Sequence, residues 1–148
     1  MRLFVSIPLP DEQRAHLERA LVGRPQDPDQ WHITLCFVGD RDEAPDLSAV
    51  TAQPFDLELA GSGSFPGVEW VGVEGDLGAL HELASAVSSA CRVQQGVYRP
   101  HLTYSRRGRA ALPPTYRGPA WTVESFDLVE SVRTHRYEHH VVETHPLS

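Results

Sequence analysis

The chain of 148 residues contains no lysine, so its thirteen basic side chains other than histidine are all arginines. It has only two cysteines, Cys36 and Cys91, which do not by themselves make a metal site. No apolar run is long enough to span a bilayer, and the short alternating run after the N-terminus stops at Pro8, too early for a signal-peptide core. We therefore expect a cytoplasmic protein with reduced thiols and no membrane partner.

Acidic residues are absent from one long stretch of an otherwise acidic chain. The net charge of −7 argues against general binding to nucleic acid. Residues 83–123, however, contain no Asp or Glu and hold Arg92, Arg99, Arg106, Arg107, Arg109 and Arg117. Arginine makes planar, bidentate contacts with phosphate, although exclusive use of arginine also follows from a biased genomic composition. We interpret Arg107 and Arg109 as loop charges that at most steer a ligand.

Hydrophobic periodicity alternates between strand and helix along the whole chain, which we interpret as one domain covering residues 1–148. Strands are predicted at 2–8, 31–38, 55–60, 68–73, 98–105, 121–132 and 137–144, and helices at 11–22, 43–53 and 77–91. Turn residues predict a connector at 61–67 and a loop at 106–119, and the last two strands are expected to form a hairpin. This order of elements is typical of an α+β fold.

Two of the predicted strands carry the same pair of side chains. His32 is followed two residues later by Thr34, and His101 by Thr103, whereas no other histidine has a threonine at that spacing. Residues i and i+2 of a strand share a face, so each strand presents an imidazole beside a hydroxyl. Each motif strand also follows a strand and a helix. This duplication predicts a pseudo-two-fold relation that makes the motifs face each other across a cleft.

Four segments carry a resemblance to a known family: Arg2 to Ile7 followed by proline, His32 to Gly39, Tyr98 to Arg106, and Tyr137 with the closing Pro146-Leu147. Together they resemble the two-histidine (2H) phosphoesterases, and within them the RNA 2′,3′-cyclic phosphodiesterases, also called the 2′-5′ RNA ligase family. The resemblance implies a bilobal α+β fold with two pseudo-symmetric antiparallel sheets, helices packed outside and a central cleft. It also implies a hydrolase without cofactor or metal, acting on RNA ends or small nucleotides that carry a 2′,3′-cyclic phosphate.

Opening a cyclic phosphodiester requires a base that takes a proton from water and an acid that protonates the leaving ribose oxygen. Histidine, with an ordinary pKa of about 6.5, suits both roles. The resemblance assigns His32 as the acid and His101 as the base, with a 2′-phosphate as product, although the residues alone do not tell the two apart. The hydroxyls of Thr34 and Thr103 are expected to hold the phosphate. The near-symmetry of the motifs also makes the reverse 2′-5′ ligation conceivable.

Phe37 and Arg106 occupy equivalent positions, five residues after each histidine. Strand parity points both side chains away from the cleft, and only a bulge or the end of the strand would bring them to it. The resemblance implies that Phe37 stacks on a base and that Arg106 pairs with phosphate. Phe37 is equally compatible with a place in the core.

Three other functions compete with this interpretation. One is an RNA-end-binding module without turnover, and another is a two-histidine phosphodiesterase for a different cyclic nucleotide or a 2′-5′ linkage. A third is a metal-dependent hydrolase that uses the C-terminal histidines. Adjacent His139 and His140 face opposite ways in a strand, so we expect no metal site there. We expect the protein to act as a monomer.

Overall fold

The computed structural model describes all residues from 1 to 148. The helices are α1 (Asp11–Ala20), the short 3-10 helix η1 (Pro28–Gln30) and α2 (Leu77–Ala90). The strands are β1 (Arg2–Pro8), β2 (Val22–Gly23), β3 (His32–Asp40), β4 (Phe55–Phe65), β5 (Val68–Gly75), β6 (His101–Arg106), β7 (Ala110–Ala111), β8 (Trp121–Val123), β9 (Ser125–Arg133) and β10 (Tyr137–Pro146). None of the helices combines the length and the apolar character needed to cross a membrane.

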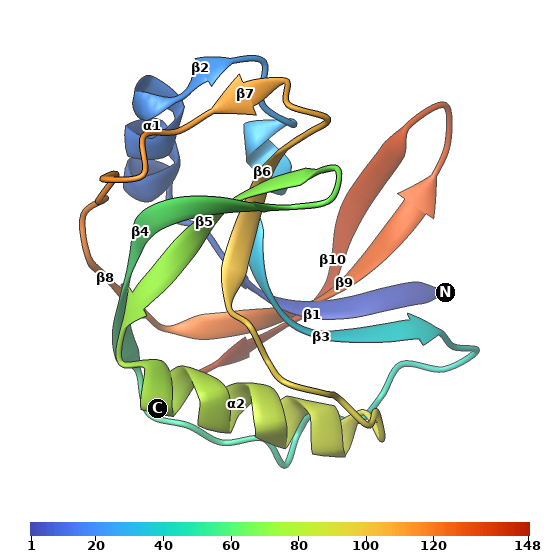
Figure 1. The fold of residues 1–148 in the computed structure, drawn as a ribbon. Helices are drawn as coiled ribbons and strands as arrows, with labels where there is room; N and C mark the ends of the chain where they lie inside the picture. The colour runs from blue at the N-terminus through green and yellow to red at the C-terminus, as the bar shows by residue number, and fades with distance from the viewer.

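Two four-stranded antiparallel sheets form the body of the fold (Figure 1), in the orders β10-β9-β1-β3 and β6-β5-β4-β8. The unit β1-α1-β3 in the first sheet corresponds to β5-α2-β6 in the second, and in each unit the two strands pair antiparallel. Each motif strand is the edge strand of its sheet. The predicted α+β fold and its internal duplication are therefore confirmed.

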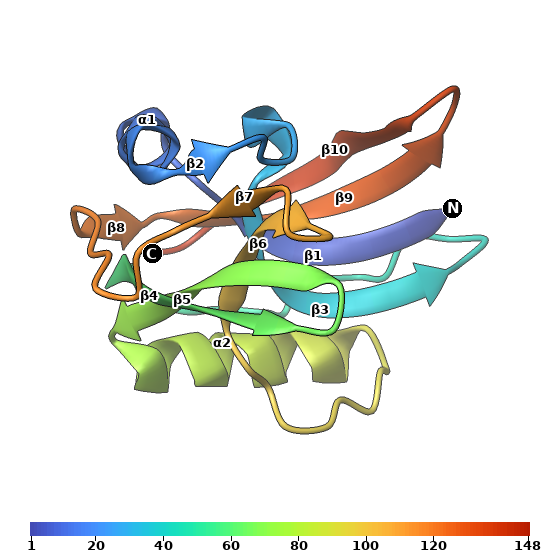
Figure 2. The ribbon, with the colours of Figure 1, turned by 45° about the horizontal axis from the view of Figure 1, so that its top comes forward.

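The two edge strands lie side by side in the middle of the molecule, where Figures 1 and 2 show β3 and β6 passing each other. A direct bond joins the two halves there, because the Tyr98 hydroxyl donates to the carbonyl oxygen of Thr34 at 2.8 Å. Helix α2 runs along one side of the sheets and α1 lies on the opposite side (Figure 2). Apolar side chains from both sheets and both helices form a single core cluster.

Helix α2 shows why this part of the chain folds as predicted. The Asp76 carboxylate accepts a hydrogen bond from the Ala79 amide at 3.0 Å, which caps a free N–H group of the first turn. The side chains at three-to-four spacing along one face are all buried: Leu80, Leu83, Ala84 and Val87. Burial of this stripe holds the helix against the β-layer.

The helix predicted at 43–53 does not form, and this prediction was wrong. The segment between β3 and β4 is a loop. Pro45 disfavours the helical conformation of the preceding Ala44, and the Asp46 carboxylate accepts a hydrogen bond from the amide of Ser48 at 2.9 Å, which forms a local turn instead. Leu47 and Val50 were expected to face inward, and Leu47 is indeed buried. Val50 is partly buried and packs against the core, so the apolar spacing was produced by a loop that turns both side chains inward.

Several element boundaries also differ from the prediction. The strand predicted at 121–132 is two strands in different sheets, β8 paired with β4 and β9 paired with β1. Residues 61–65, predicted as a connector, extend β4, while the loop at 106–119 contains the short strand β7. The first helix ends at Ala20 because Val22 and Gly23 pair with β7. A side chain at Gly23 would meet the carbonyl oxygen of Arg109 at 2.3 Å, so this close approach requires glycine.

Candidate active site

The two motifs line one open cavity of about 760 Å³ between the sheets. His32 and Thr34 enter it from β3, and His101 and Thr103 enter it from β6. The structure therefore brings together the four side chains that the repeated spacing predicted. All four are partly exposed, whereas their neighbours Ile33 and Leu102 are buried, as the alternation along a strand requires.

The two imidazoles are held in the same way. Nδ1 of His32 lies 2.7 Å from the carbonyl oxygen of Gln30, and Nδ1 of His101 lies 2.7 Å from that of Arg99. Since a carbonyl oxygen only accepts hydrogen bonds, each Nδ1 carries a proton and donates it to the residue two positions earlier. Nε2 of both rings is thereby left free of the backbone bond and can exchange a proton with a ligand.

A bulge in β3 changes the parity of this strand after Thr34. Thr34 is paired with Ser6 and Cys36 with Val5, so Leu35 is an extra residue without a partner. Leu35 and Cys36 are both buried, and the following residue, Phe37, returns to the cleft face. Its side chain is 71% exposed, which excludes the core position that its apolar character also allowed.

Strand β6 contains a bulge at the equivalent position, three residues after its histidine. Thr103 is paired with Trp70 and Ser105 with Glu69, which leaves Tyr104 unpaired. Tyr104 and Ser105 are both buried, and Arg106 then reaches the same cavity as the two histidines. Each bulge shifts the residues that follow it to the other face of the strand. Phe37 and Arg106 therefore both line the cleft, although regular alternation would point them away from it.

His32 lies in the more enclosed half of the cleft. Its ring stacks on Phe4 with 4.8 Å between the centroids, and the ring of His139 is steeply inclined to it with 5.5 Å between the centroids. Burial lowers the pKa of His32 to about 4, against the opposing effect of the bond to Gln30, and the charges of His139 and His101 lower it further. His32 is therefore neutral at neutral pH in the free protein, and its Nε2 accepts a hydrogen bond from the Thr34 hydroxyl at 3.0 Å.

His101 has different surroundings. The ring of Phe65 is perpendicular to that of His101 with 5.4 Å between the centroids, and the centroid of Trp70 lies 6.3 Å away. The Thr103 hydroxyl makes no hydrogen bond inside the chain, so it is free to donate to a ligand. The two halves of the site therefore share the orientation of their histidines but differ in enclosure and in the bonding of their threonines.

Further residues line the cleft that the sequence did not indicate: Phe4, Gln26, Gln30, Ser131, Tyr137 and His139. Tyr137 and His139 come from β10, whose pairing with β9 places them over the first motif. Their i, i+2 spacing was visible in the sequence, but nothing there showed that this hairpin joins the sheet of β3 and brings His139 to His32. His140 faces away from the cleft and bonds Glu138 at 3.1 Å. No three His, Cys, Asp or Glu side chains are grouped so as to hold a metal ion.

This arrangement, with one His-x-Thr strand from each of two corresponding strand–helix–strand units, is the one expected of the two-histidine phosphoesterase class. The family model described as the 2′-5′ RNA ligase superfamily matches residues 4–135. The chain therefore belongs to this superfamily.

Similar proteins and solved structures agree with this assignment. An RNA 2′,3′-cyclic phosphodiesterase of Thermus thermophilus is 34% identical, with 88% of this chain and 82% of that protein covered. One from Archaeoglobus fulgidus is 32% identical over 72% of each chain. The crystal structure of E. coli LigT complexed with ATP is similar at a TM-score of 0.84 and 25% identity, over 99% of this chain and 98% of LigT. LigT has also been crystallised with 3′-AMP, and that structure matches with 26% identity and a TM-score of 0.79 over 99% of this chain and 97% of LigT.

Proposed function

We propose that this protein is an RNA 2′,3′-cyclic phosphodiesterase that opens the cyclic phosphate to a 2′-phosphate with His32 and His101 as its acid and base. The observation that carries the proposal is that both imidazoles enter one cleft with Nδ1–H bound to a backbone carbonyl, so that both Nε2 atoms are available for proton transfer. The names of the relatives support the same substrate.

The reaction is an in-line displacement at phosphorus. A water loses a proton to Nε2 of one histidine as its oxygen bonds to phosphorus. The bond from phosphorus to the 3′ oxygen breaks, and this oxygen takes a proton from Nε2 of the other histidine. Atoms and charge balance without a metal, because one imidazole ends protonated as the other ends neutral. Catalysis then consists of positioning and of stabilising the charge on the phosphoryl oxygens.

We assign His32 as the acid and His101 as the base. In the free protein His32 lies against Phe4 and His139, and its lowered pKa keeps the ring neutral before substrate binds. A negatively charged phosphate entering the cleft favours the protonated ring, so substrate binding supplies the proton-bearing acid. Thr34 then exchanges its bond to Nε2 for one to a phosphoryl oxygen, and Thr103 donates to another.

The remaining cleft residues suit an RNA end. Arg106 lines the cleft and its guanidinium is suited to pairing with phosphate. The exposed rings of Phe37 and Tyr137 are suited to stacking on bases. Because both motifs come from one chain, the cleft needs no second copy, and we infer a monomer with residues 1–148 acting as one domain. We infer a cytoplasmic location, where RNA ends are available and two free thiols stay reduced.

The test is product analysis on an RNA that ends in a 2′,3′-cyclic phosphate, with a strong chelator present. The expected product carries a 2′-phosphate, formed at the same rate with and without the chelator. A 3′-phosphate product would contradict the assignment of the leaving oxygen. Loss of turnover under chelation would favour a metal-dependent hydrolase, and binding without turnover would favour an RNA-end-binding module.

A further inference from the structure

A second cavity, of about 690 Å³, adjoins the histidine cleft and is lined by arginines. Its lining residues are Arg24, Pro25, Gln26, Arg106, Arg107 and Arg109. No acidic side chain belongs to this arginine cavity, and all four arginines are exposed. Four guanidinium groups around one hollow repel one another, and an anion relieves that repulsion.

These four arginines have no carboxylate partner. The arginine ion pairs of the protein are made by Arg14 and Arg117, which lie outside the arginine cavity. The fork of each arginine in the cavity is therefore open to a ligand. Guanidinium groups bind phosphate through two parallel hydrogen bonds, which makes phosphate the anion that this lining suits best.

The turn that carries Arg107 is fixed by the protein. The Glu69 carboxylate accepts hydrogen bonds from the Ser105 hydroxyl and from the Gly108 amide, each at 2.8 Å. The Arg107 amide donates to the carbonyl oxygen of Gly67 at 3.2 Å. Arg107 itself has φ of +56°, in the left-handed region that costs a side-chain-bearing residue about 1 kcal/mol.

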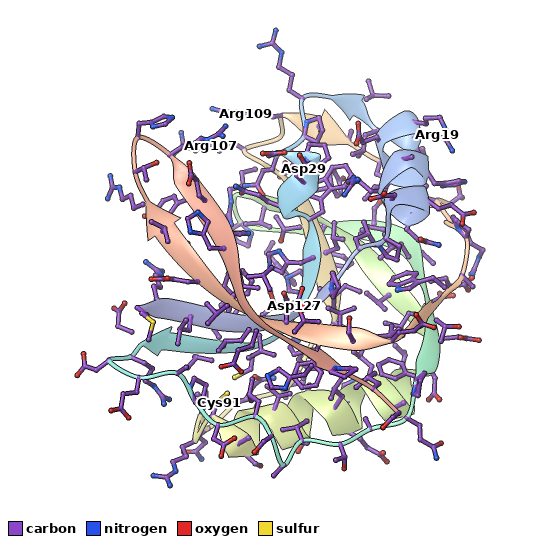
Figure 3. All side chains as sticks on the ribbon, turned by 180° about the vertical axis from the view of Figure 1, so that it is seen from behind. Arg19, Asp29, Cys91, Arg107, Arg109 and Asp127 are labelled. Carbon is purple, nitrogen blue, oxygen red and sulfur yellow. The ribbon has the colours of Figure 1, made fainter.

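Arg24 is tied to the same turn from another part of the chain. Its amide donates to the carbonyl oxygen of Arg109 at 2.8 Å, next to the pairing of β2 with β7. Segments more than eighty residues apart in the sequence thus present their arginines together. Figure 3 shows Arg107 and Arg109 at one corner of the molecule, with Arg19 on the far side.

The arginine cavity borders the histidine cleft. Gln26 and Arg106 line both of them, so Arg106 lies between the two histidines on one side and Arg107 and Arg109 on the other. A ligand whose reacting phosphate lies between the imidazoles can therefore place a neighbouring phosphate in the arginine cavity.

We propose that Arg24, Arg107 and Arg109 form a second phosphate-binding site that holds the RNA backbone beyond the reacting nucleotide. The inference rests on the proposed function, because a terminal 2′,3′-cyclic phosphate occupies the last nucleotide of a strand and every other phosphate lies on its 5′ side. The site therefore takes the phosphates 5′ to the reacting nucleotide. It makes the protein prefer an oligoribonucleotide end to a cyclic mononucleotide, which has no further phosphate to bind.

The experiment compares kcat/KM for a 2′,3′-cyclic mononucleotide and for a short oligoribonucleotide ending in the same cyclic nucleotide. The tested variants are R107Q/R109Q and, separately, R24Q. The matched control is R19Q/R92Q, which removes the same charge from exposed arginines outside both cavities. All four proteins are measured over a range of salt concentrations.

For R107Q/R109Q we expect kcat/KM on the oligoribonucleotide to fall about tenfold at low salt, while the value on the mononucleotide stays within about twofold. Each lost phosphate contact lowers the salt slope on a single strand by about 0.7, so this double variant should lose about 1.4 from the slope of log kcat/KM against log salt. R24Q should show half of that change in slope, and R19Q/R92Q should show neither effect.

Three results would overturn the inference. Equal loss on both substrates would mean that these arginines act at the reacting phosphate, and no loss on the oligoribonucleotide would mean that they do not bind it. The same loss in R19Q/R92Q would mean that only overall charge matters. If the wild-type protein turns over neither substrate, the proposed function itself fails, and that outcome is distinct from all three.

Discussion

The enclosed position of His32 leads to a prediction about its proton. In the free protein its pKa is about 4, mainly because burial disfavours the charged ring. An acid in a reaction at neutral pH must carry a proton, so the ligand has to raise this pKa. A single negative charge at about 4 Å contributes about 4 kcal/mol at an effective dielectric constant of about 20. At 1.36 kcal/mol per unit, this amounts to about three units, which brings the pKa of bound His32 to about 7.

The assay is an NMR titration of the ring of His32, free and saturated with a nucleoside 2′-phosphate as product. Calorimetry of the same binding step at pH 7, where the phosphate monoester is already mostly ionised, should show uptake of about half a proton, because His32 is neutral before binding and about half protonated after it. His32→Gln, which keeps a polar side chain on β3, identifies the resonance and should abolish this uptake.

Two results would refute this reasoning. A pKa of His32 near 6.5 in the free protein would mean that burial by Phe4 and His139 does not exclude water from the ring. A pKa that stays near 4 in the saturated complex would mean that His32 cannot be the acid at neutral pH. The roles of His32 and His101 would then have to be exchanged.

Other predictions concern stability and binding. His32 is protonated in the unfolded chain below about pH 6.5 but in the folded protein only below about pH 4, so its contribution to stability is lost as the pH falls between these values. The full decrease in the free energy of unfolding is about 3 kcal/mol. Urea unfolding at pH 7 and at pH 4.5 should therefore show a smaller decrease for His32→Gln than for the wild type. Tyr98→Phe removes the hydrogen bond to Thr34 between the two halves and should lower the unfolding free energy by about 1 kcal/mol in thermal or urea denaturation, whereas an unchanged value would mean that water replaces the bond. Phe37→Ala should change the free energy of unfolding by no more than about 0.5 kcal/mol, because the ring is exposed. It should weaken RNA binding by about 1–3 kcal/mol, because the ring stacks on a base. A fall in stability with unchanged binding would contradict this role.

The strands and the paired motifs were predictable because their signals are local. Alternation identifies a strand from a few neighbouring residues, and the His-x-Thr spacing needs only three. The loop at 43–53 was not predictable in this way, since its apolar spacing imitates a helix and only Pro45 and the bond from Asp46 to the Ser48 amide break the pattern. The division of 121–132 between two sheets depends on which strands β8 and β9 meet, and this information is not local.

The candidate site was likewise predictable only where its signals are local. The four motif side chains were found from spacing, but the bulges at Leu35 and Tyr104 were not, because a bulge is a property of pairing with β1 and β5. These bulges reconcile strand parity with the cleft positions of Phe37 and Arg106. The arginine cavity was missed for a related reason. Arg107 and Arg109 looked like ordinary loop charges until the fold brought Arg24 beside them.

The central claim is that two histidines from corresponding strands act together as acid and base. The most direct test measures turnover of an RNA 2′,3′-cyclic phosphate by His32→Ala and by His101→Ala, with circular dichroism to show that each variant is folded. Each variant should lose about two to four orders of magnitude in kcat, the usual contribution of a general acid or base. A folded variant of either kind that keeps the wild-type rate would contradict the paired mechanism.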